Sequence, residues 1–134
     1  MLAVIALGGA LGSAARYGIG AGWPTQPGGL PWATLCINLT GCALIGALMR
    51  IVTARIAPHR LLRPFLGTGV LGGFTTFSTY AVETRGLVAG GHPGLAAGYV
   101  LGTLAGALAA VTLGGAVAGR IRPLVPSRPA GERP

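Results

Sequence analysis

Long uncharged stretches dominate the pattern of hydrophobic and polar positions along this chain. Short segments containing proline, glycine or arginine separate them. A helix needs about 20 mostly apolar residues to cross a bilayer, and four stretches meet this requirement. The pattern predicts an all-α integral membrane protein with four transmembrane helices: Leu2–Gly20, Trp32–Val52, Leu61–Val88 and Gly94–Gly119.

The composition supports a membrane protein and argues against two other classes. Of 134 residues, 51% are hydrophobic and 9% are charged, whereas soluble domains carry about 25% charged residues. A disordered chain would be polar, and the 25 glycines lack the three-residue period of collagen. We expect one transmembrane domain over residues 1–119. A basic, proline-rich cytoplasmic tail over residues 120–134 is expected to be disordered.

Arginines follow the second and fourth predicted spans. Two clusters lie there: Arg50, Arg55, Arg60 and Arg63, then Arg120, Arg122, Arg128 and Arg133. The other side of the membrane receives at most Arg16 and Arg85. Because positively charged loops stay cytoplasmic, we predict a multi-pass protein of the cell (plasma) membrane with both termini in the cytoplasm. The arginines do not alternate with aromatic residues on one face, so nucleic acid is not an expected partner.

The third predicted span contains a poor helix core, because Gly72–Tyr80 reads GGFTTFSTY. Non-helical backbone survives at membrane depth only where protein or a water-filled cavity receives it. A break near Gly72–Thr76 would offer carbonyl oxygens to a hard cation or N–H groups to an anion. Alternatively, the hydroxyls bond to the preceding turn and the helix continues. The three-residue spacing predicts that Phe74, Phe77 and Tyr80 share one side of a helix.

Other polar residues within the spans have two possible explanations. Asn38 is either bonded to another helix or exposed to a polar path, because a buried unpaired amide is costly. Arg16 is a functional-site candidate, although a charge near a helix end can also snorkel to the interface. For Tyr99, Thr103 and Thr112, hydrogen bonds between helices are an adequate explanation. The sequence offers no paired carboxylates and no nucleophile beside a base, so we do not expect an enzyme.

Small residues recur at four-residue spacing, as in Gly8/Gly12, Gly69/Gly73 and the run from Gly98 to Gly106. This spacing lets membrane helices approach closely, either within one subunit or between two. Four closely packed helices fill their own centre with side chains. A transport path would therefore need a second subunit.

Three motifs together resemble one family. The run Gly72–Tyr80 resembles the GG-x-TTFST-aromatic signature of the small fluoride channels, the CrcB/Fluc family. The opening Gly8–Tyr17 resembles that family's GGxxGxxxRY motif, and Pro31–Gly41 is similar to its second-helix Asn-x-x-Gly motif. The resemblance covers about residues 1–119, with the motifs in the family's order.

The resemblance implies an antiparallel dimer with a broken third helix and fluoride pores along the interface. The implied function is passive, fluoride-selective export from the cytoplasm, which lowers fluoride toxicity. Ring edges, hydroxyls, an amide and a guanidinium would form the pathway: Arg16, Asn38, Phe77, Ser78, Thr79, Tyr80 and Thr103. The carbonyls of Gly72 and Thr75 would hold a structural sodium ion shared by both subunits.

Two departures from the family pattern matter. Tyr80 stands where the family usually has phenylalanine, which keeps the ring edge and adds a hydroxyl. The arginine bias is also stronger than a subunit that inserts in both orientations would carry. We therefore expect a fixed orientation and a heterodimer with an oppositely oriented paralogue.

The main alternative is a small multidrug exporter, which is also built from four helices in antiparallel pairs. Such a carrier needs a titratable carboxylate deep in its first helix. The first span has none, and Glu83 lies near the end of the third.

Overall fold

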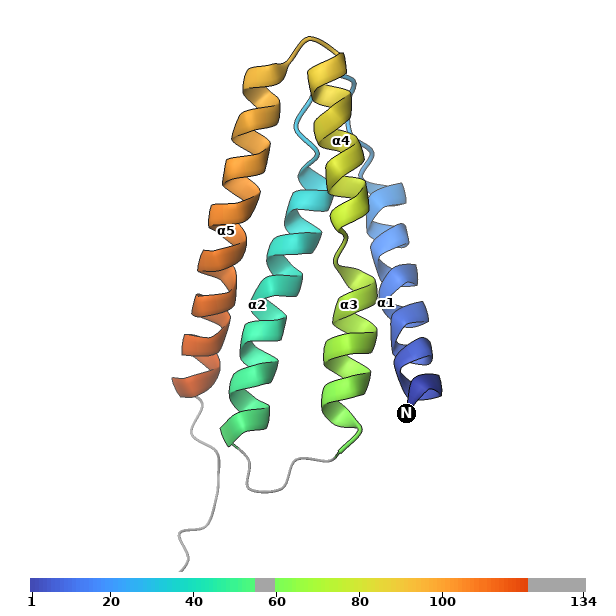
Figure 1. Cartoon of the computed structure of the whole chain (residues 1–134), viewed down its shortest axis with the longest axis vertical. Coiled ribbons are helices and arrows are strands. Elements are labelled where there is room, and N and C mark those ends of the chain that lie inside the picture. Colours follow the sequence, from blue (N-terminus) through green and yellow to red (C-terminus); the bar gives the residue numbers. More distant parts are fainter. Residues whose placement is uncertain (55–59, 121–134) are drawn as a thin grey trace, which may run out of the picture.

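The computed structural model describes residues 1–54 and 60–120 and is helical throughout its regular elements. In chain order these are α1 (Leu2–Gly22), α2 (Trp32–Ala54), η1 (Arg63–Leu71), α3 (Gly72–Phe74), α4 (Phe77–Ala89) and α5 (Pro93–Arg120). The helices run side by side as an elongated bundle (Figure 1). The tail predicted to be disordered lies outside the described residues beyond Arg120.

Three helices in the described part of the chain are long and apolar enough to cross a membrane. They are Leu2–Gly22, Trp32–Thr53 and Pro93–Arg120. Each agrees closely with a span predicted from the hydrophobic pattern. The all-helical fold of a multi-pass membrane protein is confirmed.

The third predicted span is not one continuous helix. The π-helix η1 passes into α3, and two extended residues then separate α3 from α4. Thr75 has a ψ of 154°, and Thr76 has a φ of −145° and a ψ of 125°. Phe74 ends α3 whereas Phe77 begins α4. The prediction that Phe74, Phe77 and Tyr80 share one side of a helix is therefore wrong, because that spacing assumed an unbroken helix.

Close backbone contacts join the helices in two sets. α1 packs on η1 and α3, while α2 packs on α5 (Figure 1). A Cβ on Gly12 would lie 2.0 Å from the Val70 carbonyl oxygen, and one on Gly114 would lie 2.0 Å from the Ala43 carbonyl oxygen. The missing side chains let these backbones approach. In the run from Gly98 to Gly106, a Cβ on Gly98 or Gly102 would meet nothing within 4 Å in the single chain, whereas one on Gly106 would lie 2.8 Å from Leu39 Cδ2 of α2.

Both ends of the described chain lie at one end of the bundle. Figure 1 places the N-terminus at the same end of the bundle as the last turns of α2 and α5. The helices therefore bring Arg50, Arg63 and Arg120 to this end. The loops joining α1 to α2 and α4 to α5 lie at the opposite end (Figure 1).

Many large apolar side chains remain exposed in the single chain. Leu2 is 83% exposed, Phe77 is 79% exposed and Val82 is 70% exposed. Such a large apolar surface calls for lipid or another subunit to cover it.

Candidate functional site

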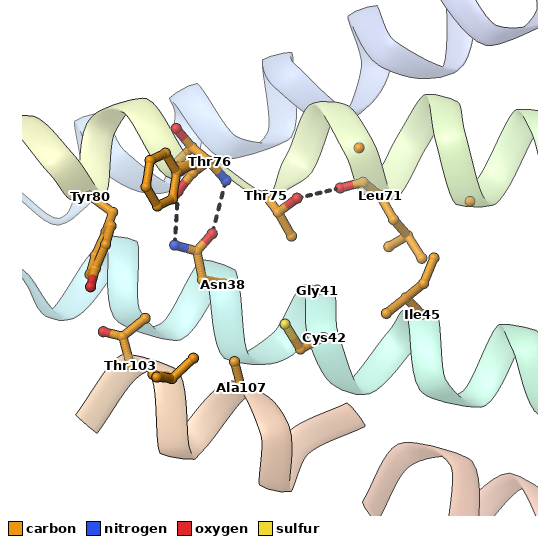
Figure 2. A pocket seen from close by; sticks show the side chains of 14 residues that line it. Asn38, Gly41, Cys42, Ile45, Leu71, Thr75, Thr76, Tyr80, Thr103 and Ala107 are labelled. Carbon is orange, nitrogen blue, oxygen red and sulfur yellow. Dashed lines mark hydrogen bonds between the residues drawn. The ribbon is translucent and has the colours of Figure 1, made fainter. Parts of the chain in front are cut away.

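A groove of about 440 Å³ lies between α2, α5 and the junction of α3 with α4. Most of the residues predicted for the pathway and the sodium site line it: Asn38, Gly72, Thr75, Phe77, Tyr80 and Thr103 (Figure 2). Arg16, Ser78 and Thr79 contact the same junction without lining this groove.

Asn38 holds the junction from the α2 side. Its Nδ2 donates to the Thr76 carbonyl oxygen at 3.0 Å, and its Oδ1 accepts from the Thr76 N–H at 2.9 Å (Figure 2). One side-chain amide thus replaces both backbone partners of an extended residue. Gly41, about one turn further along α2, makes room for the junction, because a Cβ there would lie 2.2 Å from Thr75 Cγ2. Asn38 is therefore bonded to another element and also faces the groove.

Arg16 and Ser13 hold the junction from the α1 side. The Arg16 Nε donates to the Gly73 carbonyl oxygen at 3.2 Å, and the Ser13 hydroxyl donates to the same oxygen at 3.3 Å. In a continuous helix this oxygen would accept from Phe77, the residue that begins α4. Arg16 thus satisfies backbone at the interruption, which a side chain that merely snorkelled to the interface would not do.

Two carbonyl oxygens at the junction lose their usual helical donors. The carbonyl of Gly72 would normally accept from the N–H of Thr76, which donates to Asn38 instead. The carbonyl of Thr75 would normally accept from the N–H of Thr79, which donates to the Thr76 hydroxyl at 3.2 Å. Both residues line the groove. Carbonyl oxygens freed in this way are ligands that hard cations prefer.

The start of α4 collects hydroxyl groups. Thr76 is the N-cap, and its hydroxyl accepts from Thr79 N–H while donating to the Thr79 hydroxyl at 3.0 Å. The Ser78 hydroxyl lies 3.4 Å from the same Thr76 oxygen. The amino end of a helix carries a partial positive charge and favours anions. The Thr79 hydroxyl is engaged within this cap, whereas Ser78 is exposed.

Aromatic rings continue from the junction along α4. The ring centroids of Phe77 and Tyr80 lie 5.7 Å apart with an interplanar angle of 46°. Tyr80 and Tyr99 of α5 lie 5.2 Å apart at 53°. Tilted pairs at these distances direct the positive edge of one ring towards its neighbour. Phe77 heads the row and is largely exposed.

Beyond this row, sequence reasoning missed a hydrogen-bonded cluster around one carboxylate, Glu83. Glu83 accepts from the Thr34 hydroxyl at 2.7 Å and from the Tyr99 hydroxyl at 2.8 Å. The sequence did carry one signal, which is the spacing of polar residues. Residues three or four apart lie on one face of a helix. Three polar pairs have this spacing: Thr34/Asn38, Tyr80/Glu83 and Tyr99/Thr103. Together these pairs form a polar stripe across α2, α4 and α5.

The hydroxyls of α5 only partly follow the prediction of bonding between helices. Tyr99 bonds to Glu83 of α4, as expected. Thr112 instead donates to the carbonyl oxygens of Leu108 and Ala109 in its own helix. The buried Thr103 hydroxyl has no hydrogen-bond partner among the described residues. The prediction was therefore wrong for Thr112 and Thr103.

These features define a small multi-pass membrane protein with a polar site at an interrupted helix. Over residues 3–115 the chain matches the family model described as CrcB-like protein, Camphor Resistance (CrcB). The chain belongs to this family.

Several relatives of known name are similar to the chain. It is 56% identical over 104 residues to the fluoride-specific ion channel FluC 2 of Streptomyces avermitilis, covering 78% of this chain and 66% of that relative. It is 55% identical over 114 residues to FluC 2 of Nocardia farcinica, covering 85% and 81%. It is 51% identical over 121 residues to FluC 1 of Streptomyces coelicolor, covering 90% and 79%. These relatives are named as ion channels, and this kinship agrees with the expectation that the chain is not an enzyme.

Proposed function

We propose that this chain is a subunit of a passive, fluoride-selective channel that lets fluoride leave the cytoplasm and so lowers its toxicity. The observation that carries the proposal is the junction of α3 with α4, held by Asn38 and facing a groove with aromatic and hydroxyl groups. The names of the three relatives as fluoride-specific ion channels support the same function.

In this proposal, fluoride passes the amino end of α4. The ring edges of Phe77 and Tyr80 carry partial positive charge, and the hydroxyls of Ser78 and Thr79 are hydrogen-bond donors. The amino end of α4 is the positive end of the helix dipole and also favours an anion. The Arg16 guanidinium on the α1 side raises the local concentration of anions near the entrance.

Thr103 and Asn38 supply donors on the groove wall. A buried hydroxyl without a partner is costly, so the unpaired Thr103 Oγ1 supports an ion or water in the groove. The Asn38 amide donates to the Thr76 carbonyl oxygen and is positioned beside the path.

Selectivity follows from the loss of water. An isolated buried ion costs tens of kcal/mol by Born estimates, so the path must replace hydration with O–H, N–H and ring C–H donors. Chloride is larger and fits a narrow path of fixed donors badly. Transport is passive, driven by the gradient and the membrane potential.

A structural sodium ion fits the carbonyls of Gly72 and Thr75, whose helical donors are engaged elsewhere. The ion would supply charge that stabilises the carbonyl end of α3, with an oppositely oriented subunit completing its ligands. Sodium should raise the melting temperature of the purified protein, because a ligand that binds the folded state stabilises it. An equal melting temperature in sodium and in N-methylglucamine salts would contradict this site.

The channel in this proposal is an antiparallel dimer with pores along the interface. The exposed Phe77 ring and the open face of α5 at Gly98 support a second subunit. The arginines at one end support a fixed orientation with both termini in the cytoplasm and hence pairing with a paralogue. Terminal tags labelled from each side of the membrane test this, and substantial labelling from both sides would contradict it.

The function is tested by fluoride efflux from liposomes containing this chain, started with a potassium ionophore and read with a fluoride electrode. The expected result is fast fluoride efflux without chloride efflux. Efflux from the chain alone would contradict an obligate paralogue while supporting the channel. Efflux only after adding the paralogue would support both. No fluoride efflux from folded protein in either case would contradict the channel.

A further inference from the structure

A second groove lies at the arginine end of the bundle, between the last turns of α2 and α5. Its volume is about 710 Å³. Its lining combines the polar side chains of Arg50, Thr53 and Arg120 with apolar residues that include Met49, Val111 and Gly115. We call it the basic groove. It is separate from the groove at the α3–α4 junction, with which it shares no residue.

The fold draws two positive side chains into this groove. The Arg50 side chain of α2 lies across Gly119 of α5, because a Cβ on Gly119 would be 3.0 Å from Arg50 Nε. Arg120 follows directly on α5 and lines the same groove. Like charges that line one groove repel each other, and an anion bound between them would offset that repulsion.

The described residues supply no such anion. The sequence has two acids. Glu83 is hydrogen-bonded to Thr34 and Tyr99, near the first turns of α2 and α5 and not their last turns. Glu132 lies outside the described residues. The carbonyl ends of α2 and α5 carry partial negative charge here, so any bound anion must be held by the arginines.

We propose that the basic groove binds one anionic phospholipid. The phosphate would contact Arg50 and Arg120, and an acyl chain would lie along the apolar part of the lining. Both helices are membrane spans by length and composition, so the groove opens where lipid headgroups meet acyl chains. This step rests on the orientation proposed above, in which this end faces the cytoplasmic leaflet, which is rich in anionic lipid.

The test is native mass spectrometry of the full-length protein titrated with phosphatidylglycerol in detergent. The double variant R50Q/R120Q should bind this lipid about thirtyfold more weakly, since each basic residue near an anionic membrane surface contributes about fivefold. The matched control R60Q/R63Q removes the same charge at the same end of the bundle but outside the groove, and should change binding less than twofold.

Further arms identify the ligand. Phosphatidylcholine with the same acyl chains should bind at least tenfold more weakly than phosphatidylglycerol, and excess inorganic phosphate should not displace the lipid. Equal losses in the two double variants, equal binding of both lipids or full displacement by phosphate would each overturn the proposal. If R50Q/R120Q does not fold, R120Q alone, altered in the last exposed turn of α5, should lose about fivefold. An unchanged affinity of R120Q would overturn the proposal in that case.

Discussion

The two sides of the α3–α4 junction present opposite backbone chemistry within a few residues. On the α3 side, carbonyl oxygens gather, with Gly73 bonded by α1 and the helical donors of Gly72 and Thr75 engaged elsewhere. On the α4 side, the N-cap hydroxyl of Thr76 and the first N–H groups of a helix gather. A carboxyl end is partly negative and an amino end partly positive. One interruption therefore makes a place suited to a cation beside a place suited to an anion.

Side chains from α1 and α2 keep the break from closing into a continuous helix. In hydrocarbon each unpaired backbone group costs several kcal/mol, so an unsupported break would close into a helix. Asn38 from α2 and the pair Ser13 and Arg16 from α1 supply the missing partners. Substitutions at the junction should therefore have graded effects, largest for Asn38, which bonds both backbone groups of Thr76.

The largest effect is expected for N38A, which removes both bonds to Thr76. Leaving two backbone groups unpaired costs about 1–3 kcal/mol each, and the junction loses the bonds that hold its shape. We expect the initial rate of fluoride efflux to fall by more than about a hundredfold. The control C42A changes a groove residue about one turn further along α2 and should stay within about twofold. An N38A rate above half that of the wild type would show that the amide does not hold the junction.

A smaller loss is expected for R16Q, because the charge-assisted bond to Gly73 is one of two that this oxygen receives. Hydrogen bonds to charged groups contribute about 1.5–3 kcal/mol, so fluoride efflux should fall about tenfold or more. The control R85Q removes an equal charge from an exposed position on α4. Equal losses in R16Q and R85Q would point to the net charge of the protein and not to the contact with Gly73.

The same contacts explain how far the sequence could predict this molecule. The apolar pattern located α1, α2 and α5 because the bilayer sets their length. The sequence could not decide between a broken and a continuous helix here, because the residues also suit a continuous helix. The Thr75 hydroxyl does donate to the Leu71 carbonyl oxygen at 3.0 Å. The helix nevertheless ends there, because Asn38 takes the Thr76 N–H from 38 residues away. Pairing over such a distance depends on how α2 packs and not on local composition.

The cluster around Glu83 was missed for a related reason. Glu83 and Tyr99 were both visible as polar positions, but their bond joins different helices. Helix spacing places residues on a face and does not say which faces meet. The pairing with Thr34 likewise needs the three-dimensional arrangement.

A moderate effect on stability is expected for T76A, which removes the cap of α4. Losing an N-cap side chain costs about 1 kcal/mol, which should lower the melting temperature of the purified protein by about 2–8 °C, the range that spans domains from 60 to 250 residues. T76S keeps the hydroxyl and should restore most of the loss. If T76S melts as low as T76A, the threonine methyl group and not the cap is what stabilises α4.

The smallest effect is expected for Y80F, which keeps the ring packed between Phe77 and Tyr99. The Tyr80 hydroxyl makes no side-chain hydrogen bond within the described residues, so its removal should change fluoride efflux less than about twofold. Y80L keeps an apolar side chain but removes the ring edge; since aromatic pairs contribute about 0.5–1.5 kcal/mol, efflux should fall about two- to tenfold. A greater loss in Y80F than in Y80L would reverse the assignment, because the hydroxyl would then be the donor to the ion. In that case the anion side of the junction would rely on hydroxyls throughout, and the row of rings would only support the packing of α4 on α5.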